Sequence, residues 1–196
     1  MPASPPNGSE EKTPPLPVYI LAGGKSVRYG SDKARATIDG SPLVLRLAGV
    51  LAPYAQSVTV VAASPGAYNE LGLDTIGDLI KNKGPMGGVL TALEHHGTDG
   101  WVFVAACDWV GVRPEWIDLL WRSRSLNAQA VVFRSTRHEP LFALYHTSLC
   151  DELRRRIKAA KLCMQEVLDA SRTVEVPLPA DWKGAANVNT PKDLPD

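Results

Sequence analysis

Residues 18–34 read VYILAGGKSVRYGSDKA, and this stretch decides the fold class. Its first part, VYILAG at 18–23, is a continuous apolar run that ends at a pair of glycines. Such a run is typical of a strand buried on both faces, which requires a sheet that helices cover on both sides. The second part is a glycine-rich loop that ends in Asp32-Lys33. We therefore expect a buried strand with a ligand-binding loop at its carboxyl end.

The rest of the chain repeats the order strand, loop, helix. Further strands are expected at 57–64, 75–76, 101–108, 128–135, 141–146 and 173–178, and helices at 42–54, 85–96, 114–125 and 148–162. This alternation indicates an α/β fold with a mostly parallel sheet. The strands at 128–135 and 141–146, joined by a turn that contains Arg137, are expected to be antiparallel to each other. Ligands of such sheets bind outside the carboxyl ends of the strands, where Asp78 and Asp108 follow two of them.

The composition indicates one soluble domain. The chain has 196 residues, with 21 Lys and Arg against 21 Asp and Glu, so its formal net charge is zero. This balance argues against a nucleic-acid partner, and no apolar run has the length of a membrane helix. Three cysteines without CxxC spacing favour a reducing, cytoplasmic location. Residues 1–17, rich in Pro, Ser, Gly and charged residues, are expected to form a disordered tail, and residues 18–196 the single domain.

The loop after the first strand has residue types that bind phosphate. Gly23 and Gly24 let backbone N–H groups approach an oxygen closely, and Arg28 and Lys33 supply positive charge. Phosphoryl and nucleotidyl transfer need such a site, because their catalysis is mainly positioning and charge neutralisation. A P-loop is excluded, since its first glycine would fall at Tyr19 inside the strand. The alternative is an ordinary solvated surface loop.

The order of residues in this loop resembles a known family. The run Leu-Ala-Gly-Gly-x-Ser-x-Arg-x-Gly-x-Asp-Lys at 21–33 resembles the signature of the nucleotidyltransferases, and specifically of the molybdenum cofactor guanylyltransferases. Further matches lie at 77–78, 84–88, 107–108, 140–145 and 187–191, so the similarity extends from about 18 to 194. It implies a three-layer, Rossmann-like nucleotidyltransferase fold with a mostly parallel sheet and an antiparallel part.

The resemblance also implies an activity. Members of the family transfer GMP from GTP to molybdopterin or molybdenum-molybdopterin, which gives the guanine dinucleotide cofactor and pyrophosphate. The reaction requires Mg²⁺. The expected partners are therefore GTP and the pterin acceptor, with molybdoenzymes or other cofactor-synthesis proteins as candidate protein partners.

The roles of single residues are implied by matching positions in the family. The implied nucleotide-binding residues are Leu21, Ala22, Gly23, Gly24, Lys33, Asp78 and Asp108. Catalysis would rest on Arg28, Lys33 and Asp108, with Asp108 as the metal ligand. One carboxylate at a strand end suits Mg²⁺, which prefers one or two carboxylates together with substrate phosphates and water. On the acceptor side the resemblance implies Asn187 and Asn189.

Two departures from the family pattern leave alternatives open. Trp109-Val110 replaces a segment in which a proline is usual, and Ala62-Ala63 stands where an asparagine is expected. One alternative is a cytidylyltransferase that acts on the same acceptor, or another NTP-dependent nucleotidyltransferase. The other is a non-catalytic relative that binds nucleotide or cofactor. The combination of Arg28, Lys33 and Asp108 favours an enzyme, because a pure binding protein need not keep these charges.

Overall fold

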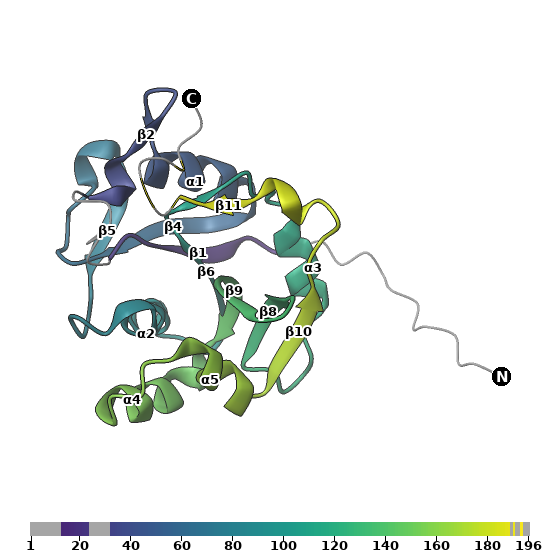
Figure 1. Ribbon diagram of the computed structural model, residues 1–196. Coiled ribbons are helices and arrows are strands. Elements are labelled where there is room, and N and C mark those ends of the chain that lie inside the picture. The colour runs from purple at the N-terminus through teal and green to yellow at the C-terminus, as the bar shows by residue number, and fades with distance from the viewer. Residues whose placement is uncertain (1–12, 24–31, 189, 191–192, 194–196) are drawn as a thin grey trace.

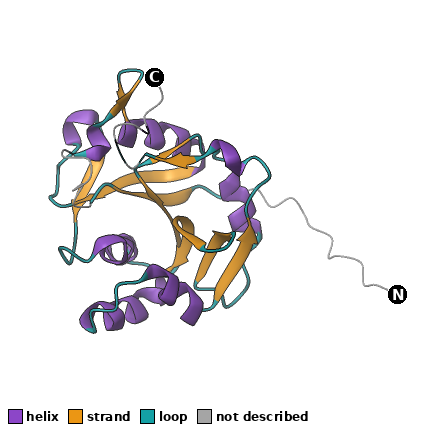
Figure 2. Ribbon diagram, in the orientation of Figure 1, coloured by secondary structure: helices purple, strands orange, loops and turns teal. Residues whose placement is uncertain are grey.

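The computed structural model describes residues 13–23, 32–188, 190 and 193, which form an α/β fold (Figures 1 and 2). The described helices are α1 (Leu43–Leu51), α2 (Gly84–His96), α3 (Trp116–Arg122), α4 (Cys150–Lys158) and α5 (Met164–Ala170). The strands are β1 (Leu16–Leu21), β2 (Thr37–Ile38), β3 (Ser41–Pro42), β4 (Ala55–Ala62), β5 (Asp74–Gly77), β6 (Trp101–Ala106), β7 (Trp109–Val110), β8 (Ala130–Arg134), β9 (His138–His146), β10 (Thr173–Pro177) and β11 (Ala186–Asn187). Three-residue 3₁₀ turns include η1 (Lys33–Arg35) and η4 (Thr147–Leu149). In this part of the chain, no helix has the length and apolar character needed to cross a bilayer.

A seven-stranded sheet organises the molecule. Its strand order is β10-β8-β9-β6-β1-β4-β5. Only β9 runs antiparallel to its neighbours β6 and β8 among the described strands of this sheet, and the other adjacent pairs are parallel. This topology confirms the expected parallel sheet with an antiparallel part. It also brings the carboxyl ends of β1, β4, β5 and β6 to one edge.

Each face of the sheet carries its own apolar core, which makes three layers (Figure 1). Successive side chains of a strand point to opposite faces. Accordingly Val18 and Ile20 of β1 pack with α1 and α3, whereas Tyr19 and Leu21 pack with α2, α4 and α5. Burial on both faces explains the continuous apolar run of the first strand.

The structured domain begins before residue 18, the start that the composition predicts. Strand β1 starts at Leu16, and Thr13 is buried, with its hydroxyl donating a hydrogen bond to the Asp118 carboxylate on α3. The boundary at residue 17 was therefore wrong, and residues 13–17 belong to the domain. The rest of the expected tail, residues 1–12, lies outside the described residues.

Two features of the C-terminal half were missed. The helix expected at 148–162 ends at Lys158, Ala160 has a positive φ of 55°, and the separate helix α5 follows. The short strands β7 and β11 form an antiparallel pair that joins the C-terminal segment to the residues after β6. Two-residue strands give no periodic signal, so only the tertiary structure reveals them.

Gly111 enables this C-terminal segment to dock. Its φ is +68°, and a Cβ atom placed on it would lie 2.1 Å from the Gly184 carbonyl oxygen. We expect Gly111→Ala to lower the free energy of unfolding by about 2 kcal/mol or more, measured by urea unfolding. Gly49 is the matched control, because it is exposed on α1 with nothing within 4 Å of its added Cβ. Gly49→Ala should raise stability by about 0.5–1 kcal/mol. Equal stabilities of the two variants would contradict the docked arrangement.

Candidate active site

The carboxyl end of β1 lies at the centre of the site. The Cys107 N–H donates to the Leu21 carbonyl at 3.1 Å, and the Ala22 N–H donates to the Val61 carbonyl at 2.8 Å. These bonds hold the backbone of residues 21–23 between β4 and β6. Three of the expected nucleotide-binding residues, Leu21, Ala22 and Gly23, are therefore at the edge where ligands of such sheets bind.

Asp78 follows β5 and lies against this turn. Its N–H donates to the Ala62 carbonyl at 2.7 Å. A Cβ atom on Gly23 would lie 3.2 Å from Oδ2 of Asp78, so the glycine leaves room for the carboxylate. Burial raises the pKa of Asp78. The carboxylate has no hydrogen-bond or ion-pair partner within the described ranges, so it is available to a ligand.

A cavity of about 530 Å³ opens beside Gly23 and Asp78. Its other lining residues are Ala63, Ser64, Lys81, Asn82 and Gly84. They follow β4 and β5, so the cavity is on the side of β1 away from β6. The lining offers a carboxylate, an ammonium, an amide and a hydroxyl. These groups can both donate and accept the hydrogen bonds that a nucleobase or ribose would make.

Lys33 and Asp108 meet on the other side of β1. Lys33 is the first residue of η1, and Asp108 follows β6. Their Nζ and Oδ2 atoms are 2.7 Å apart, and the two side chains are only 15% and 20% exposed. The pair thus places one fixed positive and one fixed negative charge next to residues 21–23. An ammonium there can bind a phosphate oxygen, and the carboxylate can bind a divalent cation.

Cys107, the residue before Asp108, is buried in the apolar core. Burial, and secondly the Asp108 charge, raise the pKa of its thiol to about 12. A thiol with this pKa stays protonated at physiological pH, and the thiolate is the nucleophilic form. Cys107 is therefore a packing residue, and the site offers no cysteine nucleophile at this position.

The C-terminal strand lies beside Asp108. The Val188 N–H donates to the Asp108 carbonyl at 3.0 Å, and Asn187 pairs in register with Trp109. Asn187 is exposed at this position. The structure thus brings Asn187, expected on the acceptor side, close along the backbone to Asp108, the expected metal ligand. Gly24, Arg28 and Asn189, the remaining expected site residues, lie outside the described residues.

Thr91 on α2 supports the site and was not expected to do so. Its buried hydroxyl accepts a hydrogen bond from the Leu79 N–H at 3.0 Å and donates to the Gly87 carbonyl at 2.8 Å. The first of these bonds fixes the residue after Asp78. A Cβ on Gly88 would lie 2.9 Å from Cδ1 of Leu21, so this glycine lets α2 pack closely under the end of β1. A threonine inside an apolar helix carries no sequence signal that would identify this role.

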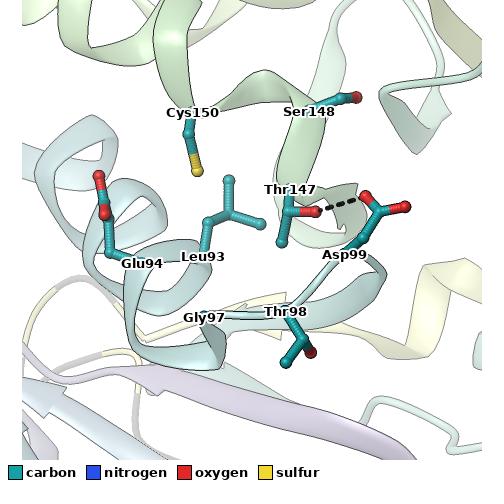
Figure 3. Close-up of a pocket in the computed structure, with 8 residues that line it drawn as sticks. All are labelled: Leu93, Glu94, Gly97, Thr98, Asp99, Thr147, Ser148 and Cys150. Atoms are coloured by element: carbon teal, nitrogen blue, oxygen red, sulfur yellow. Dashed lines mark hydrogen bonds between the residues drawn. The ribbon is translucent and has the colours of Figure 1, made fainter.

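A second, smaller hollow of about 340 Å³ lies at the opposite edge of the sheet (Figure 3). Its lining comes from the end of α2, the segment before β6, η4 and the start of α4: Leu93, Glu94, Gly97, Thr98, Asp99, Thr147, Ser148 and Cys150. The Thr147 hydroxyl donates to Asp99 across it at 3.2 Å. Because it faces the amino end of β6, this hollow is remote from the expected site residues.

The two halves of the main site complement each other. The cavity beside Asp78 can hold the base and sugar of a nucleotide, and the Lys33–Asp108 pair on the far side of residues 21–23 can hold its phosphates. Binding at this edge and neutralising phosphate charge are what nucleotidyl transfer requires. The fold and the site therefore define an α/β nucleotidyltransferase.

Comparison with known proteins narrows this class. A "molybdenum cofactor guanylyltransferase" from Serratia proteamaculans is 30% identical over 177 residues, which cover 89% of each chain. A "probable molybdenum cofactor guanylyltransferase" from Deinococcus radiodurans is 34% identical over 185 residues, which cover 92% of each chain. The crystal structure of molybdopterin-guanine dinucleotide biosynthesis protein A from Archaeoglobus fulgidus superposes with a TM-score of 0.78 at 26% identity, over 91% of this chain and 94% of that one. Residues 18–174 match the model of the MobA-like NTP transferase domain, and the chain belongs to this family.

Proposed function

We propose that this protein transfers GMP from GTP to the terminal phosphate of molybdopterin or molybdenum-molybdopterin and releases pyrophosphate. The observation that carries the proposal is the Lys33–Asp108 pair, 2.7 Å apart at the end of β1, in a chain of this family. The names of the relatives from Serratia and Archaeoglobus, which refer to a guanylyltransferase and to guanine dinucleotide synthesis, support guanine as the base.

GTP would lie across the end of β1. Its base and ribose would occupy the cavity next to Gly23 and Asp78, where the Asp78 carboxylate can accept hydrogen bonds from the donor groups of guanine. Its triphosphate would run past residues 21–23 towards Lys33. Glycine at position 23 suits this path, because a side chain would meet Asp78 and narrow the passage.

Lys33 would neutralise charge on the triphosphate. In nucleotidyl transfer the acceptor phosphate is already an oxyanion, so the protein needs no general base. Its main task is to hold the donor and acceptor phosphates together and to offset their combined negative charge. The largely buried ammonium of Lys33 is well placed for this, since electrostatic interactions are stronger where water is excluded. Arg28 is proposed to share this role.

Asp108 would hold Mg²⁺. The described residues contain no group of three or more His, Cys, Asp or Glu that could bind a metal. A single carboxylate fits Mg²⁺ nonetheless, because this ion is commonly held by one or two carboxylates together with substrate phosphates and water. When bound, the ion would neutralise phosphate charge and stabilise the pyrophosphate leaving group. Lys33 would turn from Asp108 to the phosphates as the nucleotide binds.

The pterin acceptor would approach from the side of β11. Asn187 lies there one strand from Asp108, and an exposed amide can donate and accept hydrogen bonds with a pterin ring or a phosphate. Asn189 is proposed to act with it. The reaction is expected in the cytoplasm, and molybdoenzymes or other cofactor-synthesis proteins remain candidate recipients of the product.

The choice of base is tested by comparing nucleotides. Isothermal titration with GTP, CTP and ATP in the presence of Mg²⁺ should give the lowest Kd for GTP, because the cavity presents an acceptor carboxylate to the N1 and N2 donors of guanine. Inosine triphosphate lacks the 2-amino group and should bind more weakly than GTP, by about tenfold. Equal or tighter binding of CTP would overturn the guanine assignment and support a cytidylyltransferase.

A further inference from the structure

Lys33 is held in place by a hydrogen-bond network whose buried members are Tyr68 and Ala34. The 3₁₀ turn η1 begins with Lys33, and its N-cap residue is Asp32. The Asp32 carboxylate accepts a hydrogen bond from the Ala34 N–H at 3.1 Å, which closes the turn. Ala34 is buried in the core between η1 and α1. The position of the lysine therefore depends on where the Asp32 carboxylate is fixed.

Tyr68 fixes that carboxylate from a distant part of the chain. Its hydroxyl lies 3.0 Å and 2.9 Å from the two carboxylate oxygens of Asp32, to which it donates. The tyrosine is only 2% exposed and packs within the apolar core. Burial, and secondly the hydrogen bond to Asp32, raise the pKa of Tyr68, so it remains a donor at physiological pH. Removing the hydroxyl would leave a carboxylate without this bond.

Arg35 holds the same two residues from the other side. Its guanidinium lies 5.1 Å from the centre of the Tyr68 ring and 3.2 Å from Oδ2 of Asp32. It also donates to the Ala67 carbonyl at 2.6 Å and pairs with Glu70 at 2.5 Å. The segment 67–70 is thereby attached to both ends of η1, and Tyr68 is its buried member.

The segment that carries Tyr68 also forms a wall of the cavity. It connects β4 to β5, and its first residues, Ala63 and Ser64, line the cavity. It is tied to β5, since the Gly66 N–H donates to the Thr75 carbonyl and the Tyr68 N–H to the Thr75 hydroxyl. One continuous segment thus contacts the cavity at one end and the support of Lys33 at the other.

We propose that Tyr68 is a positioning residue for the transfer step, and that it acts through the Asp32 carboxylate to hold Lys33 at the phosphate site. This inference rests on the proposed function. Tyr68 is too deeply buried to touch a nucleotide, and Lys33 is the only residue of this network that reaches Asp108 among the residues described. The tyrosine therefore affects the reaction only by placing the lysine.

Tyr68→Phe tests this role, because it removes the hydroxyl and keeps the ring that packs under Arg35. We expect kcat for pyrophosphate release to fall about tenfold, with the KM for GTP changed less than threefold, since a small displacement of a catalytic group mainly affects the transition state. Tyr54→Phe is the matched control. Its hydroxyl also donates to a carboxylate, that of Asp118 at 2.6 Å, but it lies away from the site, so kcat should be unchanged.

A double-mutant cycle separates positioning from general loss of structure. In the Lys33→Ala background, Tyr68→Phe should cause no further loss of kcat, because the group that it positions is gone. Asp32→Ser is a second variant, which keeps an oxygen for the Ala34 N–H and loses the contact with Tyr68. It should behave as Tyr68→Phe does. Additive losses in the cycle, or an unchanged kcat in Tyr68→Phe, would overturn the proposal.

The chemical reactivity of Lys33 tests whether Tyr68 positions it, independently of enzyme turnover. Acetylation of lysines by an N-hydroxysuccinimide ester, followed by mass spectrometry, should modify Lys33 several times faster in Tyr68→Phe than in the parent or in Tyr54→Phe. If the protein released no pyrophosphate with any nucleotide, the proposed function would fail. Faster labelling of Lys33 in Tyr68→Phe would still show that Tyr68 holds Lys33 in place through Asp32. Equal labelling in all three proteins would overturn it.

Discussion

Replacing Asp108 with asparagine is expected to lower kcat by about 100-fold or more, because the amide removes the charge that holds the divalent metal at the phosphates. The nucleotide should still bind, but Mg²⁺ should no longer strengthen its binding. Isothermal titration with GTP, with and without Mg²⁺, measures this directly. In the parent protein we expect the Kd to fall on addition of Mg²⁺, and in Asp108→Asn we expect no change.

The matched control for Asp108→Asn is Asp74→Asn. Asp74 is the exposed first residue of β5 and lines neither the cavity nor the ion pair. This variant should keep the activity and metal response of the parent. Both variants should retain the circular dichroism spectrum of the parent, since neither residue belongs to the apolar cores. Normal turnover by folded Asp108→Asn would contradict the assignment of Asp108 as the metal ligand.

Replacing Lys33 with alanine is the second substitution for which we expect a large loss of activity. Loss of a charge-assisted hydrogen bond to phosphate should lower kcat/KM by about 10- to 100-fold. Lys33→Arg keeps the charge but has a longer, planar head group, so it should recover part of the activity. Steady-state kinetics with GTP varied at saturating acceptor separate the effect on binding from the effect on the chemical step.

Lys158 provides the control for the lysine. It is exposed at the end of α4, on the face of the sheet away from η1. Lys158→Ala should leave kcat/KM unchanged, which would show that a general reduction of positive charge does not explain the loss. If Lys33→Ala were as active as Lys158→Ala, the lysine would have no part in phosphate binding.

Most of the central site could be predicted from the sequence, for a physical reason. Gly23, Asp78 and Asp108 each follow a strand of one parallel sheet, and the carboxyl ends of such strands meet at one edge. Their proximity is therefore a consequence of the fold class. In the structure Gly23 and Asp78 are adjacent, and Lys33 pairs with Asp108.

The supporting residues could not be predicted, because their contacts depend on tertiary structure alone. Tyr68 lies 36 residues from Asp32 in the sequence, in a connection without a periodic pattern. For the same reason, the sequence did not predict the pairing of β7 with β11 or the separate helix α5. The N-terminal boundary was wrong because Thr13 is buried and bonds to Asp118 of α3, a tertiary contact that local composition does not reveal.

The most direct test of the proposed reaction measures pyrophosphate release. Purified protein would be incubated with molybdenum-loaded molybdopterin, Mg²⁺ and one nucleoside triphosphate at a time, with Asp108→Asn as the inactive control. We predict release with GTP, dependence on both acceptor and Mg²⁺, and formation of a guanine dinucleotide product. Release with CTP alone would keep the mechanism and change the substrate. No release with any nucleotide, from folded protein and competent acceptor, would contradict the proposal.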